Sequence, residues 1–330
     1  MQNILSLNNF NLSYAGYDLT LGSSGPVPPV DPYNPLNLPE YTIRLLFTDG
    51  YYPTFDKGTS VRVSTTYSPN IWDLTYANND WSRILRYQSN LLEVLGANTT
   101  NVTNMHEMFV GCSNLTTVTL FNTSNVTNMQ SMLAGCSSLT TVPLFDTSIV
   151  TNMQGMCGNC SSLTTVPLFN TSNVTDMRFM LYGCSLLTTV PLFNTSKVTD
   201  MLGMFYDCSS LTTVPLFDTS NVTDMGRMFE NCSSLTSVPL FNTSKVISME
   251  IMFDQCSSLT LVPLFDTSKV TYIRVMFSNC VNVQSGALAL YQQLSTQSKP
   301  PTDHYQTFYN CGINTTQGAA ELAQIPSDWK

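Results

Sequence analysis

The sequence predicts an α/β solenoid, a stack of short coils that each follow the same course. Three observations lead to this prediction: a fixed period, one apolar pattern per period that suits a strand, and a second that suits a helical turn. A period of this size is typical of coils that contact only their neighbours along the chain. Cysteines mark the 24-residue period, at Cys112, Cys136, Cys160, Cys184, Cys208, Cys232, Cys256 and Cys280.

One copy of the repeat contains both apolar patterns. Leu211–Leu216 reads Leu-x-x-Val-x-Leu, the leucine-rich-repeat spacing in which one short parallel strand per coil points its apolar residues inward. Between Val222 and Cys232, apolar residues fall at steps of three and four, as on one face of a short helical turn. Pro215 cannot donate to a strand ladder, so we expect two or three paired residues per coil. The predicted stack is right-handed.

Methionine and cysteine ladders fill the predicted core. Apart from Met1, every methionine falls in one of two slots of the repeat, represented by Met225 and Met228. Thioethers could bind a soft metal, but slots that alternate so regularly with Leu, Val and Phe favour core filling. Equivalent cysteines of adjacent coils lie about 4.8 Å apart, slightly too far for a relaxed disulfide, so free buried thiols are expected.

The chain is predicted to have five parts. An N-terminal segment that is expected to dock on another molecule is followed by an extended Pro/Gly/Ser linker. A β-rich N-terminal cap, the solenoid and a helical C-terminal cap come next, because open solenoid ends would otherwise expose core. The predicted boundaries are 1–21 for the anchoring segment, 22–39 for the linker, 40–90 for the N-terminal cap, 91–280 for the solenoid and 281–330 for the C-terminal cap.

Both caps have their own signals. Tyr41–Phe47 and Ser60–Thr66 are rich in β-branched and aromatic residues, and the turn residues between them predict a hairpin. After Cys280 the repeat pattern fails, and segments 287–294 and 316–324 are predicted to be helical.

Composition and charge narrow the classes of partner. The 330-residue chain has a formal net charge of −9, with 43% hydrophobic and 11% charged residues. An acidic, lysine-poor surface argues against nucleic acid or an anionic membrane, because both need clustered Lys and Arg. No run of about 18 apolar residues could insert into a membrane. Residues 1–21 also lack the charged start of a secretory signal peptide.

The sequence offers no candidate catalytic, cofactor-binding or metal-ligating residue. Cys157 and Cys160 have the C-x-x-C spacing of redox and zinc sites, but both occupy core slots of the repeat. Asp146 and Asp218 recur as turn residues interchangeable with Asn, whereas a catalytic group appears once. Asn-x-Ser/Thr triplets, as at Asn122, would be glycosylation acceptors only on a eukaryotic secretory route.

The residues that vary between copies lie on the outer side of the predicted helical turn, whereas the strand face is a constant strip of threonine pairs. Variable aromatic and arginine side chains are the kind that anchor partners, and neutral drift on a solvated face is the alternative. The candidate binding residues are Arg178, Phe179, Tyr182, Tyr206, Arg227, Tyr272 and Arg274.

The unit C-x-x-L-x-x-V-P-L-F-D/N-T-S-x-V-T-D/N-M-x-x-M-F-x-x resembles the BspA-like leucine-rich repeats of bacterial surface proteins and of related phage and prophage products. The resemblance covers residues 76–280. It implies a non-enzymatic binding or adhesion module with no catalytic or metal residues. Departures such as Cys157 in a Phe slot leave the expected fold unchanged.

The missing export signal leads to a hypothesis about location. A phage structural protein is assembled in the cytoplasm and released by lysis, so the first hypothesis is a virion component, as a head fibre, decoration or tail-associated adhesin. Residues 1–21 would bind phage particle proteins, and the solenoid would bind a protein or glycan of a bacterial or host surface. The alternative is a bacterial cell-surface adhesin with an unrecognised export route. A homo-oligomer is left open.

Overall fold

The computed structural model describes residues 13–14, 17–18, 38–51, 53, 55, 59–63 and 70–330. The chain divides into two units, Met1–Asn34 and Pro35–Lys330. In the first unit, β1 (Ser13–Tyr14) pairs antiparallel with β2 (Tyr17–Asp18). The rest of the predicted anchoring segment and most of the predicted linker lie outside the described residues.

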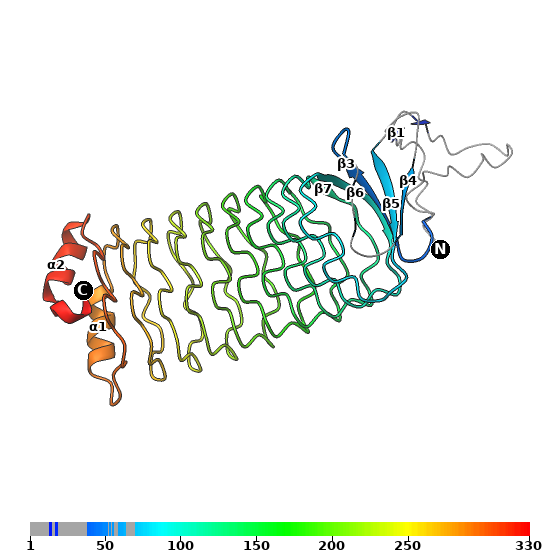
Figure 1. Ribbon diagram of the computed structural model, residues 1–330. Coiled ribbons are helices and arrows are strands. Elements are labelled where there is room, and N and C mark those ends of the chain that lie inside the picture. Colours follow the sequence, from blue (N-terminus) through cyan, green and yellow to red (C-terminus); the bar gives the residue numbers. More distant parts are fainter. Residues whose placement is uncertain are drawn as a thin grey trace, which may run out of the picture. The chain divides into compact units, whose positions relative to one another are not determined.

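The second unit begins with a five-stranded sheet at one end of the coil stack (Figure 1). The pairs β4–β5, β5–β3 and β3–β6 are antiparallel, and β6–β7 is parallel. The parallel pair joins the sheet to the coils, because β7 lies in the coil that Cys112 opens. In spatial order, the strands are β4 (Thr59–Val63), β5 (Ile71–Thr75), β3 (Thr42–Phe47), β6 (Leu91–Asn98) and β7 (Thr117–Val118).

The predicted hairpin between Tyr41–Phe47 and Ser60–Thr66 is wrong, because β5 lies between β3 and β4. Gly50 does turn the chain, with a φ of +75°, but the strand beside β3 comes from later in the sequence. Arg44 on β3 donates from Nε to Asp73 Oδ1 on β5 at 2.7 Å, and 5% of the Arg44 side chain is exposed. Because a buried guanidinium needs such a partner, this ion pair favours β5 as the neighbour of β3.

Backbone hydrogen bonds between equivalent positions hold the coils together. The residue before each first methionine slot, usually Asp or Asn, forms a parallel bridge with its equivalent in the next coil, and the series begins with Asp80 and Asn104. Thr127 N donates to Thr103 O of the preceding coil at 2.9 Å, whereas Met105 N donates to Asn128 O of the following coil at 3.0 Å. The predicted solenoid is confirmed, and its coils lie side by side along the second unit (Figure 1).

The segment predicted as a helical turn is a run of tight turns instead. Met108 N donates to Met105 O at 3.2 Å, which closes a turn of four residues. The third residue of that turn, Glu107, has a φ of 53°, and Gly111, four residues later, has a φ of 72°. Left-handed residues at this spacing exclude an α-helix, whose residues all have negative φ. The apolar spacing of three and four is met by successive turns.

The strand predicted in each coil also has fewer paired residues than expected. In the described coils after β7, one bridge remains on this side, between Leu261 and Ser285. Leu211 and Val214 are buried as expected, but Leu216 is 60% exposed. The expectation that all three residues of Leu-x-x-Val-x-Leu point inward is therefore wrong for the last leucine.

A turn at Pro-Leu-Phe explains the outward leucine. Phe145 N donates to Pro143 O at 2.9 Å, and the equivalent bond recurs in the next two coils. A bond that closes over three residues is a γ-turn centred on the leucine. It directs Leu144 outward and Phe145 into the core, where 2% of Phe145 is exposed. The repeat proline thus ends the strand and reverses the next two side chains.

Equivalent side chains stack into ladders that fill the core. The Phe205 and Phe229 rings, one coil apart, are stacked with centroids 5.6 Å apart. All ten cysteines are free and buried, and the repeat thiols donate to backbone carbonyls, as Cys256 Sγ does to Phe229 O at 3.0 Å. A buried threonine ladder links successive coils, because Thr219 Oγ1 donates to Asn242 O at 2.8 Å. Core slots therefore combine dispersion contacts with satisfied polar groups.

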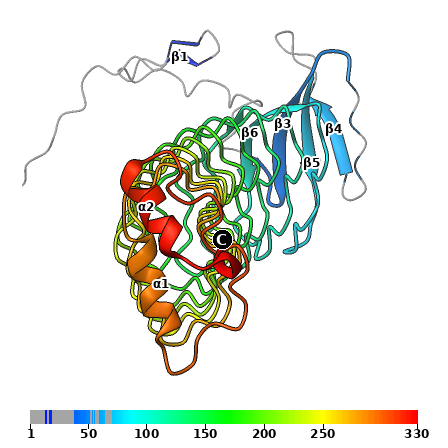
Figure 2. The same cartoon turned by 90° about the vertical axis from the view of Figure 1, so that its left-hand side faces the viewer.

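Two helices lie across the C-terminal end of the coils (Figure 2). They are α1 (Ala287–Ser295) and α2 (Thr316–Gln324), and a short 3₁₀ helix, η2 (Ser327–Trp329), follows. Both α-helices coincide with the segments expected to be helical. Trp329 is buried and stacks on Phe308 with centroids 6.4 Å apart. Gln293 Nε2 donates to Thr267 Oγ1 at 2.9 Å, so α1 supplies a polar partner to the last threonine of its ladder.

Candidate functional site

All seven candidate binding residues lie on the side of the coils formed by the tight turns. Tyr272 is the bridge residue of its coil, and the other six lie between the bridge residue and the repeat cysteine. The structure separates them into three clusters along the stack. The first contains Arg178, Phe179 and Tyr182, the second contains Tyr206 and Arg227, and the third contains Tyr272 and Arg274.

Two aspartates hold the arginine of the first cluster. Arg178 Nη2 lies 2.6 Å from Asp176 Oδ2, and Arg178 Nε lies 3.7 Å from Asp200 Oδ2. The pKa of Arg178 is raised, first by its hydrogen bond to Asp176. Because this guanidinium is 38% exposed, it keeps a free edge for a partner while its position is fixed.

The aromatic residues of the first cluster are half-buried, because each ring lies over a glycine of a neighbouring coil. A Cβ added at Gly203 would lie 2.3 Å from Phe179 Cε1, and one added at Gly158 would lie 2.0 Å from Tyr182 Cε1. The two rings meet edge to face with centroids 5.9 Å apart. Phe179 and Tyr182 therefore form a fixed aromatic platform rather than free anchors.

Substitution of Gly203 by alanine should destabilise the platform and its coil. The added methyl group overlaps Phe179, so we expect a loss of roughly 1–3 kcal/mol in the free energy of unfolding, measured by urea denaturation. Gly155→Ala is the matched control, because Gly155 has the same φ of 60° but would meet only Ser131 Oγ at 3.1 Å. Equal losses in the two variants would contradict the overlap, and Phe179→Ala should rescue Gly203→Ala.

Burial raises the pKa values of two acidic groups in and around the second cluster, Glu230 and Tyr206. Arg227 Nη1 lies 2.9 Å from Glu230 Oε2, and 12% of the Glu230 side chain is exposed. Burial raises the pKa of Glu230 and outweighs the Arg227 guanidinium, which lowers it. The pKa of Tyr206 is also raised, first by burial and then by the carboxylate of Asp207. This cluster lies directly beside the groove described below, since Tyr206 precedes a groove residue.

Both residues of the third cluster are exposed. Tyr272 is 49% exposed, and its backbone bridges Ser248 and Asp303 in the adjacent coils. The Arg274 guanidinium lies over the Tyr305 ring, 5.5 Å from its centroid. Tyr272 and Arg274 therefore both reach solvent.

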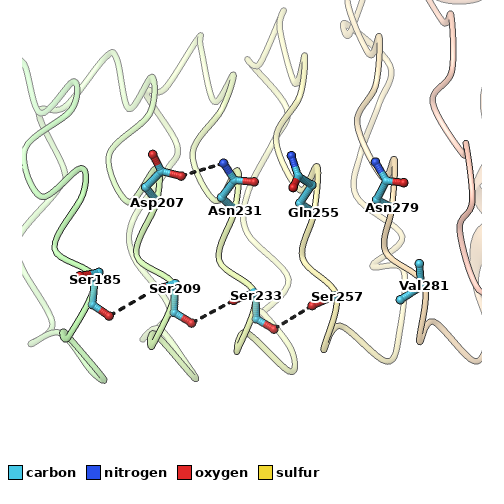
Figure 3. A pocket seen from close by; sticks show the side chains of 9 residues that line it. All are labelled: Ser185, Asp207, Ser209, Asn231, Ser233, Gln255, Ser257, Asn279 and Val281. Atoms are coloured by element: carbon cyan, nitrogen blue, oxygen red, sulfur yellow. Dashed lines mark hydrogen bonds between the residues drawn. The ribbon is translucent and has the colours of Figure 1, made fainter.

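A polar groove crosses five coils next to the second cluster, and it has a volume of about 560 Å³. Figure 3 shows its two rows of side chains, one of carboxylate and amide groups and one mainly of serines. The lining residues are Asp207, Asn231, Gln255 and Asn279 in the first row and Ser185, Ser209, Ser233, Ser257 and Val281 in the second.

Hydrogen bonds order both rows. Asn231 Nδ2 donates to Asp207 Oδ1 at 2.7 Å, which leaves the Asn231 carbonyl oxygen as an acceptor. In the other row, Ser233 Oγ donates to Ser209 O at 3.3 Å, so the serine oxygens keep their lone pairs. The groove therefore presents many acceptors, fewer donors and one carboxylate.

The groove residues were not among the sequence candidates. Their signal is present in the last position before each repeat cysteine, where Gly111 and Gly135 give way to Asp207, Asn231 and Gln255 in later coils. Glycine at this position lacks a side chain to build a groove wall. The change from glycine to polar side chains could have identified the groove, but the pattern does not show which residues lie opposite.

The recurrent acidic and sulfur groups have structural roles. Asp146 and Asp218 each accept from the backbone N–H of the serine two residues later, as predicted for turn residues. Burial raises the pKa of Cys160 to about 12, which keeps this thiol neutral and unreactive. In the part of the chain that the structure describes, no three His, Cys, Asp or Glu side chains are grouped to hold a metal ion.

The helices of the described residues are too short or too polar to cross a bilayer.

The fold and the groove together define the class, a repeat solenoid with a ligand-sized polar groove on its outer side. Three overlapping stretches, 79–191, 163–260 and 212–311, match the family described as "Mycoplasma protein of unknown function, DUF285". These stretches cover more than half of the chain, and the protein belongs to this family. No curated protein matches the chain.

Several solved structures of leucine-rich repeat proteins are similar to this chain. A leucine-rich repeat protein from Eubacterium ventriosum is 20% identical, with a TM-score of 0.31 over 57% of this chain and 40% of that chain. A leucine-rich repeat protein from Bacteroides ovatus is 19% identical, with a TM-score of 0.27 over 66% of this chain and 71% of that chain. A leucine-rich cell surface protein from Faecalibacterium prausnitzii is 18% identical, with a TM-score of 0.29 over 66% of this chain and 79% of that chain. None of these descriptions names an enzymatic activity.

Proposed function

We propose that this protein is a non-enzymatic, surface-displayed binding protein that holds an uncharged glycan along the groove of Figure 3. The observation that carries the proposal is the double row of mainly polar side chains across five coils. Sugar hydroxyls both donate and accept, and the groove offers amides, serine oxygens and a carboxylate in repeated spacing. Its volume of about 560 Å³ falls within the range of ligand pockets.

The charge of the groove supports an uncharged ligand. Among the nine lining residues, Asp207 is the one charged side chain, and none is Lys or Arg. An anionic chain would meet Asp207 without a compensating cation, which costs binding energy. Tyr206 does not line the groove, but its hydroxyl is hydrogen-bonded to the groove residue Asp207, and aromatic residues are enriched at binding sites.

Removal of two amides should weaken binding. Asn231→Ala with Gln255→Ala deletes two adjacent donors and acceptors of the first row, and we expect about a 10-fold to 100-fold loss of affinity for the bound glycan. The measurement is an array of bacterial and host glycans, followed by calorimetry with the strongest ligand. Gln130→Ala with Gln154→Ala is the matched control, since these amides lie on the same side of earlier coils, outside the groove.

The control pair should bind as the unsubstituted protein does. Retained affinity in the groove variant, or binding restricted to anionic glycans, would contradict the groove as the site. No binding to any glycan on the array would leave the platform of Phe179 and Tyr182 as the competing contact surface, to be tested with protein ligands.

For the location we favour a bacterial cell surface. The family description names a bacterium, Mycoplasma, which supports a cellular protein over the virion component expected from the sequence. Attachment of residues 1–21 to a phage particle remains the alternative, and these residues lie largely outside the described part of the chain. Peptide mass spectrometry on washed bacterial envelopes and on density-purified phage particles separates the two, because stoichiometric peptides in particles alone would overturn the cell-surface location.

A further inference from the structure

Seven leucines form an exposed row along the coils. Six of them follow the repeat proline and Leu120 follows Thr119, and each is between 49% and 64% exposed. The hydrogen bond of the γ-turn holds Leu144, Leu168 and Leu192 outward, and the leucines of the other coils are exposed at the same position of the repeat. This row, the leucine ridge, consists of Leu120, Leu144, Leu168, Leu192, Leu216, Leu240 and Leu264.

The ridge is large enough to form an interface. If burial of each half-exposed leucine removes about 100 Å² from water, the seven expose on the order of 700 Å² in one continuous row. A contiguous apolar patch on a monomer seldom exceeds about 600 Å². A stable interface buries roughly 800 Å² on each partner, which the ridge and its polar flank together can supply.

The polar flank is a second exposed row. The residue two positions after each ridge leucine is Asp or Asn, and a surface hollow of about 370 Å³ is bordered by Leu120, Leu144, Asn122 and Asp146. The ridge and the flank therefore belong to one surface. The flank residues, all exposed, are Asn122, Asp146, Asn170, Asn194, Asp218, Asn242 and Asp266.

We propose that the leucine ridge is the interface of an antiparallel homodimer, in which a second copy of this chain packs about a two-fold axis at Leu192. An axis that runs across the ridge, at right angles to the stack, places each row opposite the same row of the other copy. Such a self-complementary contact closes as a dimer. All seven leucines then meet leucines, with Leu168 opposite Leu216 and Leu192 opposite its own equivalent.

Charge complementarity selects this arrangement. With the axis at Leu192, each flank aspartate faces an asparagine of the second copy: Asp146 faces Asn242, Asp218 faces Asn170, and Asp266 faces Asn122. An Asn side chain can donate to a carboxylate. A shift by one coil in either direction places Asp146 opposite Asp218 or Asp266, and such like-charge pairs are unfavourable.

The test begins with sedimentation velocity on the full chain between about 1 and 100 μM. The unsubstituted protein should sediment as a dimer. Leu168→Glu with Leu216→Glu introduces facing carboxylates near the axis and should raise the dissociation constant by about 100-fold or more. Leu186→Glu with Ile247→Glu is the matched control, because these residues are 51% and 46% exposed but lie off the ridge.

Folding is checked in every variant by the native cysteines, which are all buried and should stay unreactive toward a thiol reagent. A monomeric unsubstituted protein at about 100 μM would overturn the proposal, as would a dimer that survives the ridge substitutions but not the control substitutions. Monomeric chains that bind neutral phosphatidylcholine vesicles through the ridge would assign the ridge to a lipid surface and also overturn it.

A crosslink tests the register. Asn194→Cys places an accessible thiol on the axis, opposite its own equivalent, so a short bis-maleimide should join two copies efficiently. Asn122→Cys is the control, since its equivalent lies opposite Asp266, six coils or about 29 Å away at the usual strand spacing. Equal crosslinking of the two variants would overturn the antiparallel register.

Discussion

Above pH 9, the free energy of unfolding should fall steeply, because ten cysteines are buried as neutral thiols. Burial raises the pKa of Cys112, Cys160 and Cys311 from the ordinary value of 9.0 to about 12. Burial also raises the pKa of the other seven thiols. Because all ten buried thiols resist ionisation in the folded state, the effect should dominate the alkaline limit of stability.

The direction follows from proton counting. Below pH 9 both states hold their thiol protons, and the contribution to stability is complete. Between pH 9 and about 12, the unfolded chain loses thiol protons that the folded chain retains, so stability falls as pH rises. Each thiol contributes about 1.4 kcal/mol per pH unit. Over a single pH unit, ten thiols together therefore contribute an amount that approaches the roughly 5–15 kcal/mol total stability of a typical protein.

Urea denaturation at pH 7.5, 8.5 and 9.5 measures this effect. Cys256→Ala is the matched variant. It should reduce the slope of stability against pH by about one thiol, or 1.4 kcal/mol per unit above pH 9, whatever its cost at neutral pH. A free energy of unfolding that stays constant between pH 7.5 and 9.5 would show that the thiols are not held neutral.

Phe229→Ala should cause the largest loss of stability among single core substitutions. The Phe229 side chain is fully buried and stacks on Phe205, Phe241 and Phe253 with centroids 5.6, 6.3 and 5.5 Å apart. Removal of such a ring costs about 3–5 kcal/mol. Because coils contact only their neighbours, the cavity cannot be filled from elsewhere.

Two controls accompany this variant in thermal and urea unfolding. Phe229→Leu should cost much less, since Leu133 and Leu181 fill the same slot in other coils. Leu186→Ala, at a position that is 51% exposed, should change stability by under about 0.5 kcal/mol. A loss below about 1 kcal/mol for Phe229→Ala would mean that the ring ladder does not carry the interface between coils.

The candidate site was predicted only in part. The sequence located the variable side of the coils, and Arg178, Phe179 and Tyr182 do form one cluster there. It did not reveal that Phe179 rests on Gly203, because that contact joins residues 24 positions apart whose side chains lean toward the next coil. The groove was missed for a similar reason, since Asp207 and Asn231 become a wall only when their coils are stacked.

By itself, the sequence determined the period, the identity of the core ladders and the segments that form α1 and α2. These features follow from which residues avoid water, and apolar spacing records that choice directly. The tertiary structure alone decided that turns replace the predicted helical segment and that Leu216 faces solvent. The sign of φ at Glu107 and the bond from Phe145 to Pro143 cannot be derived from apolar spacing, since several backbones bury the same residues. Bonds to the neighbouring coils select one of them.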